Sequence, residues 1–460
     1  MNYRNIIILI LLIIALLGCD RRSARLSLLI GDPSIEGFVS LEPDAVTMYA
    51  SPADKKAGRI ECRIYEDEYP VFINMFKVLD NARINEVYRE KRQSRFTADF
   101  IDEIKSMTEK NKPMPENSDL PLAGIRIAID PGHSAGSFNE AIMESKYMWL
   151  FARNGAQIKF YEAQLNLETA RILKEMLEKD GAIVMQTRDS GRQAYPVPFN
   201  IWAVRNFSQA VDEKMRDNHI SPALAHRLLS GIGNEAKLKF FNSEIEMPYR
   251  AKIINAFHPH VTVLVHYDAR DEETAFRSKY LRIKDIFEDP YAQCTQKLKD
   301  ISEVLKSVSE TKRDYCTVFV PGCFLSNELN TIESRIEFLR LIISPDLDNS
   351  IVYSKYVLEN FKDYLDLPGA RESFSASISV SSFRPGLYAR NFRMTRLVRG
   401  TLCLGEPLQQ NNIAEAAGLS QIATGKTPER VKLVARAYYD AIRKYVKMHI
   451  AREKEKKGAS

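Results

Sequence analysis

Residues 125–133 read IRIAIDPGH, an apolar run that ends in a turn and a histidine. Residues 163–179 then carry apolar side chains at helical spacing, and a second apolar run, AIVMQTR, follows and ends at Arg188. Strand, helix and strand in this order form a βαβ unit, whose two strands lie parallel in one sheet. We therefore expect an α/β protein with a mixed, largely parallel sheet that is flanked by helices.

Two further apolar runs, VTVLVH and TLCLGE, end in the same way, at His266 and Glu406. Glu162, in the segment YEAQLNL, opens the helix that follows the first strand. In an open α/β sheet, ligands bind beyond the carboxyl ends of the strands, and these ends share one edge. We therefore expect His133, Glu162, His266 and Glu406 to converge there, although they are far apart in the sequence.

Two imidazoles and a carboxylate form a ligand set for catalytic zinc, which keeps its fourth position for water. Zinc lowers the pKa of that water towards about 7, and a second carboxylate within hydrogen-bond reach can take its proton. Glu406 suits this second role because its strand aims it into the crevice. The four residues together predict a zinc-dependent hydrolase.

Other polar residues near the strand ends have supporting roles in this interpretation. Asp130 either orients a ligating histidine as a carboxylate behind it or caps the turn. His258 and His260 precede the strand that ends at His266, so we expect them at its far end, facing solvent. Three residues are expected to join strand ends to helices: Arg188, Arg250 and Asn255.

The order of these motifs resembles a known family. IAIDPGH is followed by E-x-x-LNL, TR, R-x-x-x-x-N before VLVHYDA, and an apolar strand ending in Glu with Asn six residues later. This order resembles the zinc-dependent N-acetylmuramoyl-L-alanine amidases of the Amidase_3 type. The resemblance implies their phosphorylase/hydrolase-like amidase fold and one Zn²⁺ bound by His133, Glu162 and His266. It also implies that Glu406 is the catalytic base and that peptidoglycan is cut between N-acetylmuramic acid and the L-alanine of the stem peptide.

The chain departs from the family pattern at several places. Ser134 and Ala135 stand where the family has glycine-rich sequence, Asp268 replaces an asparagine, and residues 407–410 (PLQQ) replace a Gly-Phe-Leu-Ser segment. Asp268 adds a possible negative charge near the metal. These departures leave an alternative open, a catalytically degenerate amidase-fold lipoprotein that binds or regulates cell-wall enzymes. A zinc peptidase that cuts within the stem peptide is a third hypothesis.

We expect the catalytic domain to span residues 123–455, with insertions at about 190–248 and 270–345. The first insertion has helical patterns and lies beside the expected crevice, so it is a candidate lid that an activator protein displaces. Residues 46–105 contain short β-prone runs and form a small β-rich or α/β region of unknown role. Residues 106–122 are rich in Pro, Asn and Asp and read as a linker.

The N-terminus has the pattern of an exported lipoprotein. Residues 1–18 contain a short apolar stretch that is typical of a signal peptide, and LLGC resembles a lipobox in which Cys19 becomes lipidated. Residues 19–45 would then be a tether, and the protein would lie at the periplasmic face of the inner or outer membrane. Export permits disulfides, and Cys316 and Cys323 flank a turn across which they can pair.

Composition limits the classes of partner. The 460 residues are 45% hydrophobic and 27% charged, which is typical of a globular protein with a sizeable core. The net charge of +5 is mild and gives no argument for nucleic acid. The expected partners are therefore peptidoglycan, a membrane contacted through the lipidated Cys19, and an activator acting on an insertion.

Overall fold

The structure is a computed structural model that describes residues 21–110, 120–152, 154–231, 233–270, 275–289, 292–371, 374, 376–380 and 385–450. The predicted signal peptide and the lipidation site at Cys19 lie outside these residues. Among the described residues, no helix combines the length and the apolar character that a membrane crossing requires.

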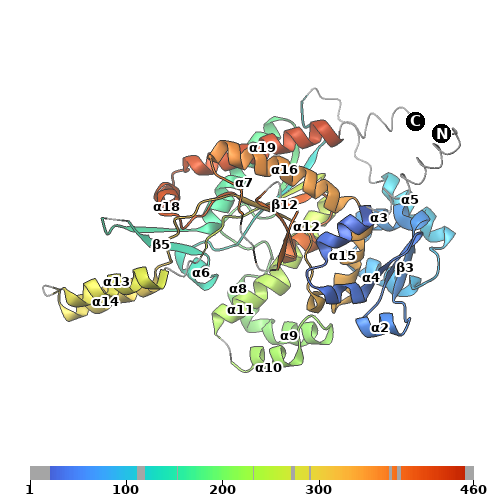
Figure 1. The fold of residues 1–460 in the computed structure, drawn as a ribbon, viewed down its shortest axis with the longest axis horizontal. Coiled ribbons are helices and arrows are strands. Elements are labelled where there is room, and N and C mark those ends of the chain that lie inside the picture. Colours follow the sequence, from blue (N-terminus) through green and yellow to red (C-terminus); the bar gives the residue numbers. More distant parts are fainter. Residues whose placement is uncertain are drawn as a thin grey trace, which may run out of the picture.

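A seven-stranded sheet forms the centre of the molecule (Figure 1). Neighbouring strands are parallel along β12-β8-β4-β7 and between β11 and β9, whereas β9–β12 and β10–β11 are antiparallel. The α/β fold with a mixed, largely parallel sheet is thus confirmed. In sheet order the strands are β10 (Ser377–Ser379), β11 (Leu387–Arg390), β9 (Thr317–Val320), β12 (Leu402–Glu406), β8 (Val261–Val265), β4 (Arg126–Pro131) and β7 (Ile183–Gln186).

Helices cover both faces of the sheet, so its central strands are buried on both sides. Helices α7 (Glu162–Lys179), α16 (Asp346–Leu365) and α19 (Glu429–Tyr445) pack against one another over one face (Figure 1). Alternate strand residues point to the opposite face, where α12 (Met247–Phe257) and α17 (Arg393–Leu397) build a second core. Helix α19 ends at Tyr445, and residues 446–450 form a π-helical turn after it.

The segment between β4 and α7 contains a short helix and a β-hairpin, which no pattern described for the sequence predicts. Helix α6 (Phe138–Met143) is followed by an antiparallel hairpin of β5 (Tyr147–Phe151) and β6 (Gln157–Tyr161). Met148 and Phe160, which lie opposite each other on the two strands, are both buried. The hairpin leads directly into α7 and therefore fixes where that helix begins.

The first predicted insertion is helical. Helices α8 (Phe199–Arg205), α9 (Phe207–Arg216), α10 (Pro222–Leu229) and α11 (Asn234–Phe241) enclose a separate aromatic core that includes the side chains of Trp202, Phe207 and Phe241. A π-helical turn, Asn242–Glu246, connects this subdomain to α12.

The second predicted insertion is only partly peripheral. Helices α13 (Ala275–Glu288) and α14 (Cys294–Lys306) form a hairpin that projects from the molecule (Figure 1). The chain then enters the centre of the sheet as β9, continues through a turn of 3-10 helix at 326–329, and forms α15 (Ile332–Ile343). All four residues of β9 are buried, so this strand belongs to the core of the main domain.

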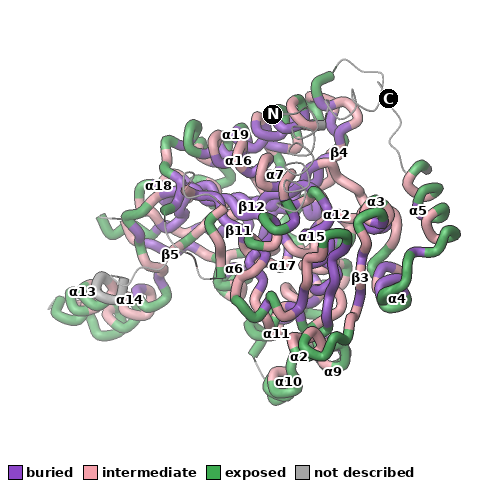
Figure 2. Tube along the Cα trace, turned by 45° about the vertical axis from the view of Figure 1, so that its right-hand side comes forward, coloured by how far each residue is buried: buried purple, intermediate pink, exposed green. Residues whose placement is uncertain are grey.

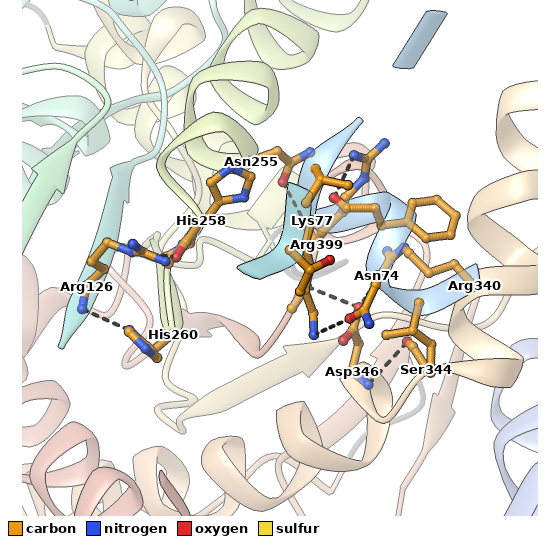
Figure 3. Close-up of a pocket in the computed structure, with 16 residues that line it drawn as sticks. Asn74, Lys77, Arg126, Asn255, His258, His260, Arg340, Ser344, Asp346 and Arg399 are labelled. Atoms are coloured by element: carbon orange, nitrogen blue, oxygen red, sulfur yellow. Dashed lines mark hydrogen bonds and ion pairs between the residues drawn. The ribbon is translucent and has the colours of Figure 1, made fainter. Parts of the chain in front are cut away.

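The N-terminal region folds into a small three-stranded antiparallel sheet with helices. Its strands are β1 (Val39–Leu41), β2 (Ala45–Met48) and β3 (Cys62–Tyr65), and its longer helices are α3 (Tyr69–Val78), α4 (Asn81–Lys91) and α5 (Ala98–Lys110). This N-terminal module packs on α15, and the guanidinium of Arg335 donates two hydrogen bonds to Glu61, each of 2.7 Å. It also reaches the amino ends of the central strands, where Arg399 donates to the Phe76 carbonyl oxygen at 3.2 Å (Figure 3).

Residues 21–45, for which the sequence suggests a tether, are part of this folded body. Residues 21–29 are helical, Leu29 is fully buried, and Arg25 forms a 2.7 Å ion pair with Asp348 at the start of α16. Apolar side chains recur here (Leu26, Leu29, Ile35 and Phe38) and supply a face that packs on the domain. Figure 2 shows the burial that results along the chain.

The cysteines of the described part are all free. Cys316 and Cys323 do not form the disulfide that their spacing suggests, because the extended strand β9 lies between them and holds them at its two ends. Cys403 is fully buried in β12, as a small hydrophobe in a strand should be.

Candidate metal centre

Three side chains that the sequence places apart meet at the carboxyl edge of the sheet. His133 follows β4, His266 follows β8, and Glu162 is the first residue of α7. The Glu162 Oε1 atom lies 3.3 Å from His133 Nε2 and 3.1 Å from His266 Nδ1. Within the described residues, this is the group whose potential ligand atoms all lie within 4.8 Å of one another.

The chemistry of the three side chains fits a divalent metal. Burial lowers the pKa of His266, an effect that Glu162 partly opposes, so the neutral ring that coordinates metals is favoured. Burial alone would raise the pKa of Glu162, but His133 and Lys146 outweigh it and hold this pKa well below its usual range. The Glu162 Oε2 atom is buried without a hydrogen-bond partner. A buried carboxylate in this condition is costly unless a cation approaches it.

Gly132 allows the ring of His266 to lie against the backbone before His133. A Cβ atom at position 132 would lie 2.2 Å from Cε1 and 2.4 Å from Nε2 of that ring. His133 itself has a left-handed backbone with φ of 58°. The Pro-Gly-His sequence therefore places the two imidazoles with ring centroids 5.1 Å apart and nearly perpendicular planes.

Glu144 supports His133, a role that the sequence analysis did not assign. Its carboxylate lies 3.7 Å from His133 Nδ1 and accepts a 2.9 Å hydrogen bond from Ser134 Oγ. A carboxylate behind a ligating imidazole fixes the orientation of the ring. Glu144 follows the short helix α6, whose side chains show no pattern that marks it as part of the site.

Lys146 is a second site residue that the sequence analysis missed. Its Nζ atom lies 3.6 Å from Glu162 Oε2, and the nearby carboxylate of Glu162 raises its pKa despite the cost of burial. Glu406 and Asp268 act in the same direction. Lys146 immediately precedes β5, so the unpredicted hairpin positions it.

Glu406 ends β12 beside His266. The strands β12 and β8 pair Gly405 with Val265, so the next residues of each strand, Glu406 and His266, lie side by side at the edge. Burial raises the pKa of Glu406 well above its usual range, and the carboxylates of Asp268 and Glu162 add to this effect. A carboxyl group with a raised pKa is suited to accept and return a proton near neutral pH.

Two departures from the family pattern contact each other. Asp268 Oδ2 accepts a 2.7 Å hydrogen bond from Gln409 Nε2, and the Asp268 carbonyl oxygen accepts one of 2.8 Å from the Gln410 amide. Gln409 and Gln410 are almost fully buried. The pair thus joins the end of β8 to the end of β12, and the extra acid at position 268 has a dedicated donor.

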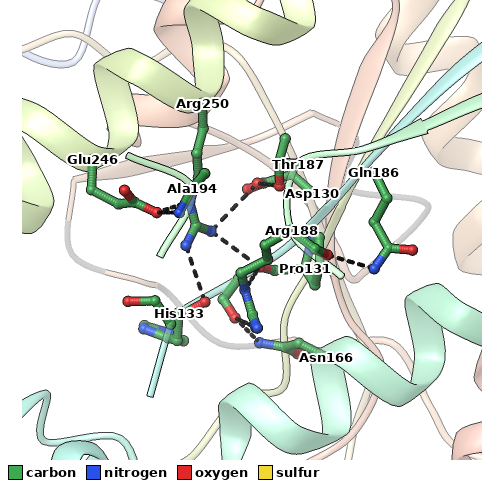
Figure 4. Close-up of polar contacts among 12 residues, drawn as sticks. Asp130, Pro131, His133, Asn166, Gln186, Thr187, Arg188, Ala194, Glu246 and Arg250 are labelled. Atoms are coloured by element: carbon green, nitrogen blue, oxygen red, sulfur yellow. Dashed lines mark hydrogen bonds and ion pairs between the residues drawn. The ribbon is translucent and has the colours of Figure 1, made fainter. Parts of the chain in front are cut away.

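Two buried arginines hold the turn that carries His133 (Figure 4). Arg188 donates to the carbonyl oxygens of Pro131 and Gly132, and Arg250 donates to those of Pro131 and His133. Burial, together with repulsion from Arg250, lowers the pKa of Arg188 to about 9. The predicted joining role of both arginines agrees with these contacts.

Asp130 does not lie behind a ligating histidine, which was one of its two expected roles. Its carboxylate accepts from the Thr187 hydroxyl and forms a 3.4 Å ion pair with Arg250 (Figure 4). It therefore neutralises the arginine beneath the turn, and Glu144 is the carboxylate that lies beside a ligating histidine.

Asn255, His258 and His260 lie at the opposite end of the sheet. Asn255 accepts from the Arg399 amide and donates to the Leu397 carbonyl oxygen, which joins α12 to the start of β12. His260 Nδ1 accepts from the Arg126 amide at 3.0 Å. Both histidines are far from the metal centre as expected, but they line a cavity instead of facing open solvent.

Residues 127–444 match the model of the Amidase_3 family, described as N-acetylmuramoyl-L-alanine amidase. The chain belongs to this family. The amidase family acts on peptidoglycan, and the His133–Glu162–His266 group of this Amidase_3 chain is consistent with its zinc site. No curated protein matches the chain.

Solved amidase structures resemble the chain at low identity. The CwlD amidase of Clostridioides difficile, solved in complex with the GerS lipoprotein, is 14% identical with a TM-score of 0.33, and the match covers 70% of this chain and 98% of that one. The amidase Ami1 of Mycobacterium abscessus is 12% identical with a TM-score of 0.36, covering 71% and 100%. AmiC2 of Nostoc punctiforme is 11% identical with a TM-score of 0.34, covering 71% and 99%.

Substituting Gly132 tests the packing beneath the metal centre. In Gly132→Ala the new methyl group must displace the His266 ring, so we expect zinc affinity to fall about 10- to 100-fold, as when the support of a ligand is lost. Competition with a chromogenic chelator measures this affinity. Gly418→Ala, where a Cβ meets no atom within 4 Å, is the control and should bind zinc like the wild type. Equal zinc affinity of Gly132→Ala and the wild type would contradict this geometry.

Proposed function

We propose that the protein is a zinc-dependent amidase that hydrolyses the bond between N-acetylmuramic acid and the L-alanine of the stem peptide. One observation carries the proposal: ligand atoms of His133, Glu162 and His266 lie within 4.8 Å of one another, with Glu406 on the strand beside His266. Family membership supplies the substrate class.

The residues of the site divide the work of hydrolysis. His133, Glu162 and His266 would hold Zn²⁺, which when bound supplies Lewis acidity and a water of lowered pKa. Glu406 accepts the proton of the attacking water and returns it to the leaving amine. Lys146 balances the surrounding carboxylates, and Glu144 keeps the ring of His133 in place.

Glu406→Gln separates chemistry from metal binding. The amide keeps the size of the side chain but cannot take a proton, so we expect turnover to fall by about 10²- to 10⁴-fold while zinc content stays the same. For the wild type, mass spectrometry of the digested peptidoglycan should detect released peptides with a free N-terminal L-alanine, and for Glu406→Gln this product should be strongly reduced. Glu178→Gln, an exposed change on α7, is the matched control and should keep full activity.

Each other outcome has a definite reading. Full activity of Glu406→Gln would show that Glu406 is not the general base. A wild-type protein that neither binds zinc nor cuts the polymer is the regulatory lipoprotein of the alternative hypothesis. Fragments cut between residues of the stem peptide identify a peptidase.

We also propose that the protein is lipidated at Cys19 and held at the periplasmic face of the inner or outer membrane. The apolar run before LLGC supports this proposal. Cys19→Ser should abolish incorporation of labelled fatty acid and move the protein from the membrane to the soluble fraction. Retention of both label and membrane association in Cys19→Ser would disprove the anchor.

The first insertion is proposed to restrain access to the site until an activator protein displaces it. Its first turn touches the loop after His133, since a Cβ on Gly136 would lie 2.2 Å from the Gly191 carbonyl oxygen. Replacing residues 196–242 with a short flexible linker should therefore raise basal activity on purified peptidoglycan. A folded variant with wild-type activity, judged by circular dichroism and turnover, would exclude the restraint.

A further inference from the structure

A cavity of about 540 Å³ lies at the end of the sheet opposite the metal centre (Figure 3). The N-terminal module forms one wall through α3, and the amino ends of β4, β8 and β12 form the other, through Arg126, His260 and Gly400. This volume is in the range of sites for small molecules. The proposed amidase reaction makes no use of the cavity.

The polar lining is mainly cationic. Six basic or imidazole residues line the cavity together with a single acid, Asp346. This acid is already paired, because Arg340 binds both Asp346 and Glu337. The basic and imidazole residues that line the cavity, apart from Arg340, are Lys77, Arg126, His258, His260 and Arg399.

Arg126 and Arg399 are not fully satisfied by the protein. Arg126 donates from Nε to the His258 carbonyl oxygen at 2.9 Å, and no ion pair of its guanidinium occurs among the described residues. Arg399 donates to the Phe76 carbonyl oxygen and to Asn81 Oδ1 and lies 3.5 Å from Glu337, so it is the buried Nε atom of its guanidinium that has no hydrogen-bond partner. A buried donor without an acceptor is costly, whereas the half-exposed guanidinium of Arg126 can donate to a ligand from its Nη atoms.

Electrostatics across the cavity agree with this geometry. Burial lowers the pKa of His258, and the positive charges of Arg126 and Arg399 lower it further. Burial also lowers the pKa of Arg126, and no carboxylate opposes that effect. Both arginines therefore disfavour a positive charge on His258, and a negative charge in the cavity would offset their effect.

The remaining wall is apolar. Ile73, Phe76, Val78 and Pro259 line it, and the Phe76 ring centroid lies 5.0 Å from the Arg399 guanidinium carbon. The stacked ring holds Arg399 in place and leaves room beside the cations for a less polar group. A ligand with an anionic head and a short apolar or neutral body matches this lining.

We propose that the cavity binds a phosphate-bearing small molecule, with the phosphate against the guanidinium group of Arg126 and near His258. Planar guanidinium forks match phosphate oxygens, and the other basic side chains of the lining add positive charge. The ligand bridges the N-terminal module and the catalytic domain, and it lies apart from the zinc ligands. The same phosphate chemistry occurs in soluble phosphate esters and in phospholipid headgroups, and the test distinguishes these sources.

The test titrates inorganic phosphate and glycerol 3-phosphate into the purified full chain at constant ionic strength. We expect a saturable rise in Tm of about 2–4 °C and measurable heat of binding, because a ligand that binds only the folded state stabilises it. Arg126→Gln should weaken binding at least about tenfold, as expected for a lost charge-assisted contact. Lys174→Gln removes one exposed positive charge on α7 and should bind like the wild type.

Two further variants keep the result unambiguous. Zinc also binds phosphate, so the response is measured in His266→Ala, which disables the metal centre. This variant should keep the phosphate response. Loss of the response would overturn the cavity proposal and leave the proposed amidase function unaffected. If Arg126→Gln fails to fold, His258→Asn replaces it, since asparagine tolerates the left-handed backbone at φ of 51°. This variant should weaken binding at least about threefold.

A vesicle arm identifies the source of the phosphate. The cavity binds a lipid headgroup if the protein co-sediments with phosphatidylglycerol vesicles, Arg126→Gln abolishes this co-sedimentation, and soluble phosphates give no response. A response to soluble esters alone assigns it to a soluble ligand. The proposal is overturned if neither probe binds, if chloride gives the same shift as phosphate, or if Arg126→Gln binds like the wild type.

Discussion

The turn Pro131-Gly132-His133 depends on two buried guanidinium groups. Arg188 and Arg250 donate to its three successive carbonyl oxygens, which no strand partner could satisfy in this geometry. With the turn fixed, the left-handed residue 133 and the ring of His266 meet at one point. Buried cations are tolerated here because Asp130 and Glu246 neutralise Arg250. Every later feature of the metal centre follows from this clamp.

The charge balance at the catalytic edge favours a divalent ion. Four carboxylates gather there, those of Glu144, Glu162, Asp268 and Glu406, and Lys146 is the basic side chain that acts on three of them. Burial raises the pKa of Glu406, and the carboxylates of Asp268 and Glu162 raise it further, although Lys146 and Arg390 oppose them. A cation of charge two beside Glu162 restores the balance, which explains why the departure at Asp268 is compatible with metal binding.

Much of the fold follows from sequence, but some elements carry too little local signal. Long periodic segments such as 163–179 and 428–445, and apolar strands that end in polar residues, are visible because burial imposes their spacing. Strand β9 is missed because four buried residues look the same in a core strand and in an insertion. Residues 21–45 look like a tether because their packing partners, such as Asp348, are hundreds of residues away.

The same distinction applies to the site. His133, Glu162, His266 and Glu406 can be identified because each stands at a strand end or helix start, where topology dictates convergence. Glu144 and Lys146 act through the hairpin that follows α6, and its position depends on tertiary contacts. No local sequence pattern indicates that Glu144 and Lys146 lie beside the metal ligands. The two glutamines after Glu406 read as departures, and only their contact with Asp268 explains them.

The antiparallel direction of β9 determines where the N-terminal module lies relative to the metal centre. Because β9 runs against β12, the chain that enters beside Glu406 leaves at the other rim, where α15 carries the N-terminal module. The metal centre and the N-terminal module thus lie at opposite ends of the sheet. If the chain is anchored through its N-terminal segment as proposed, the metal centre would face away from the membrane and towards the peptidoglycan.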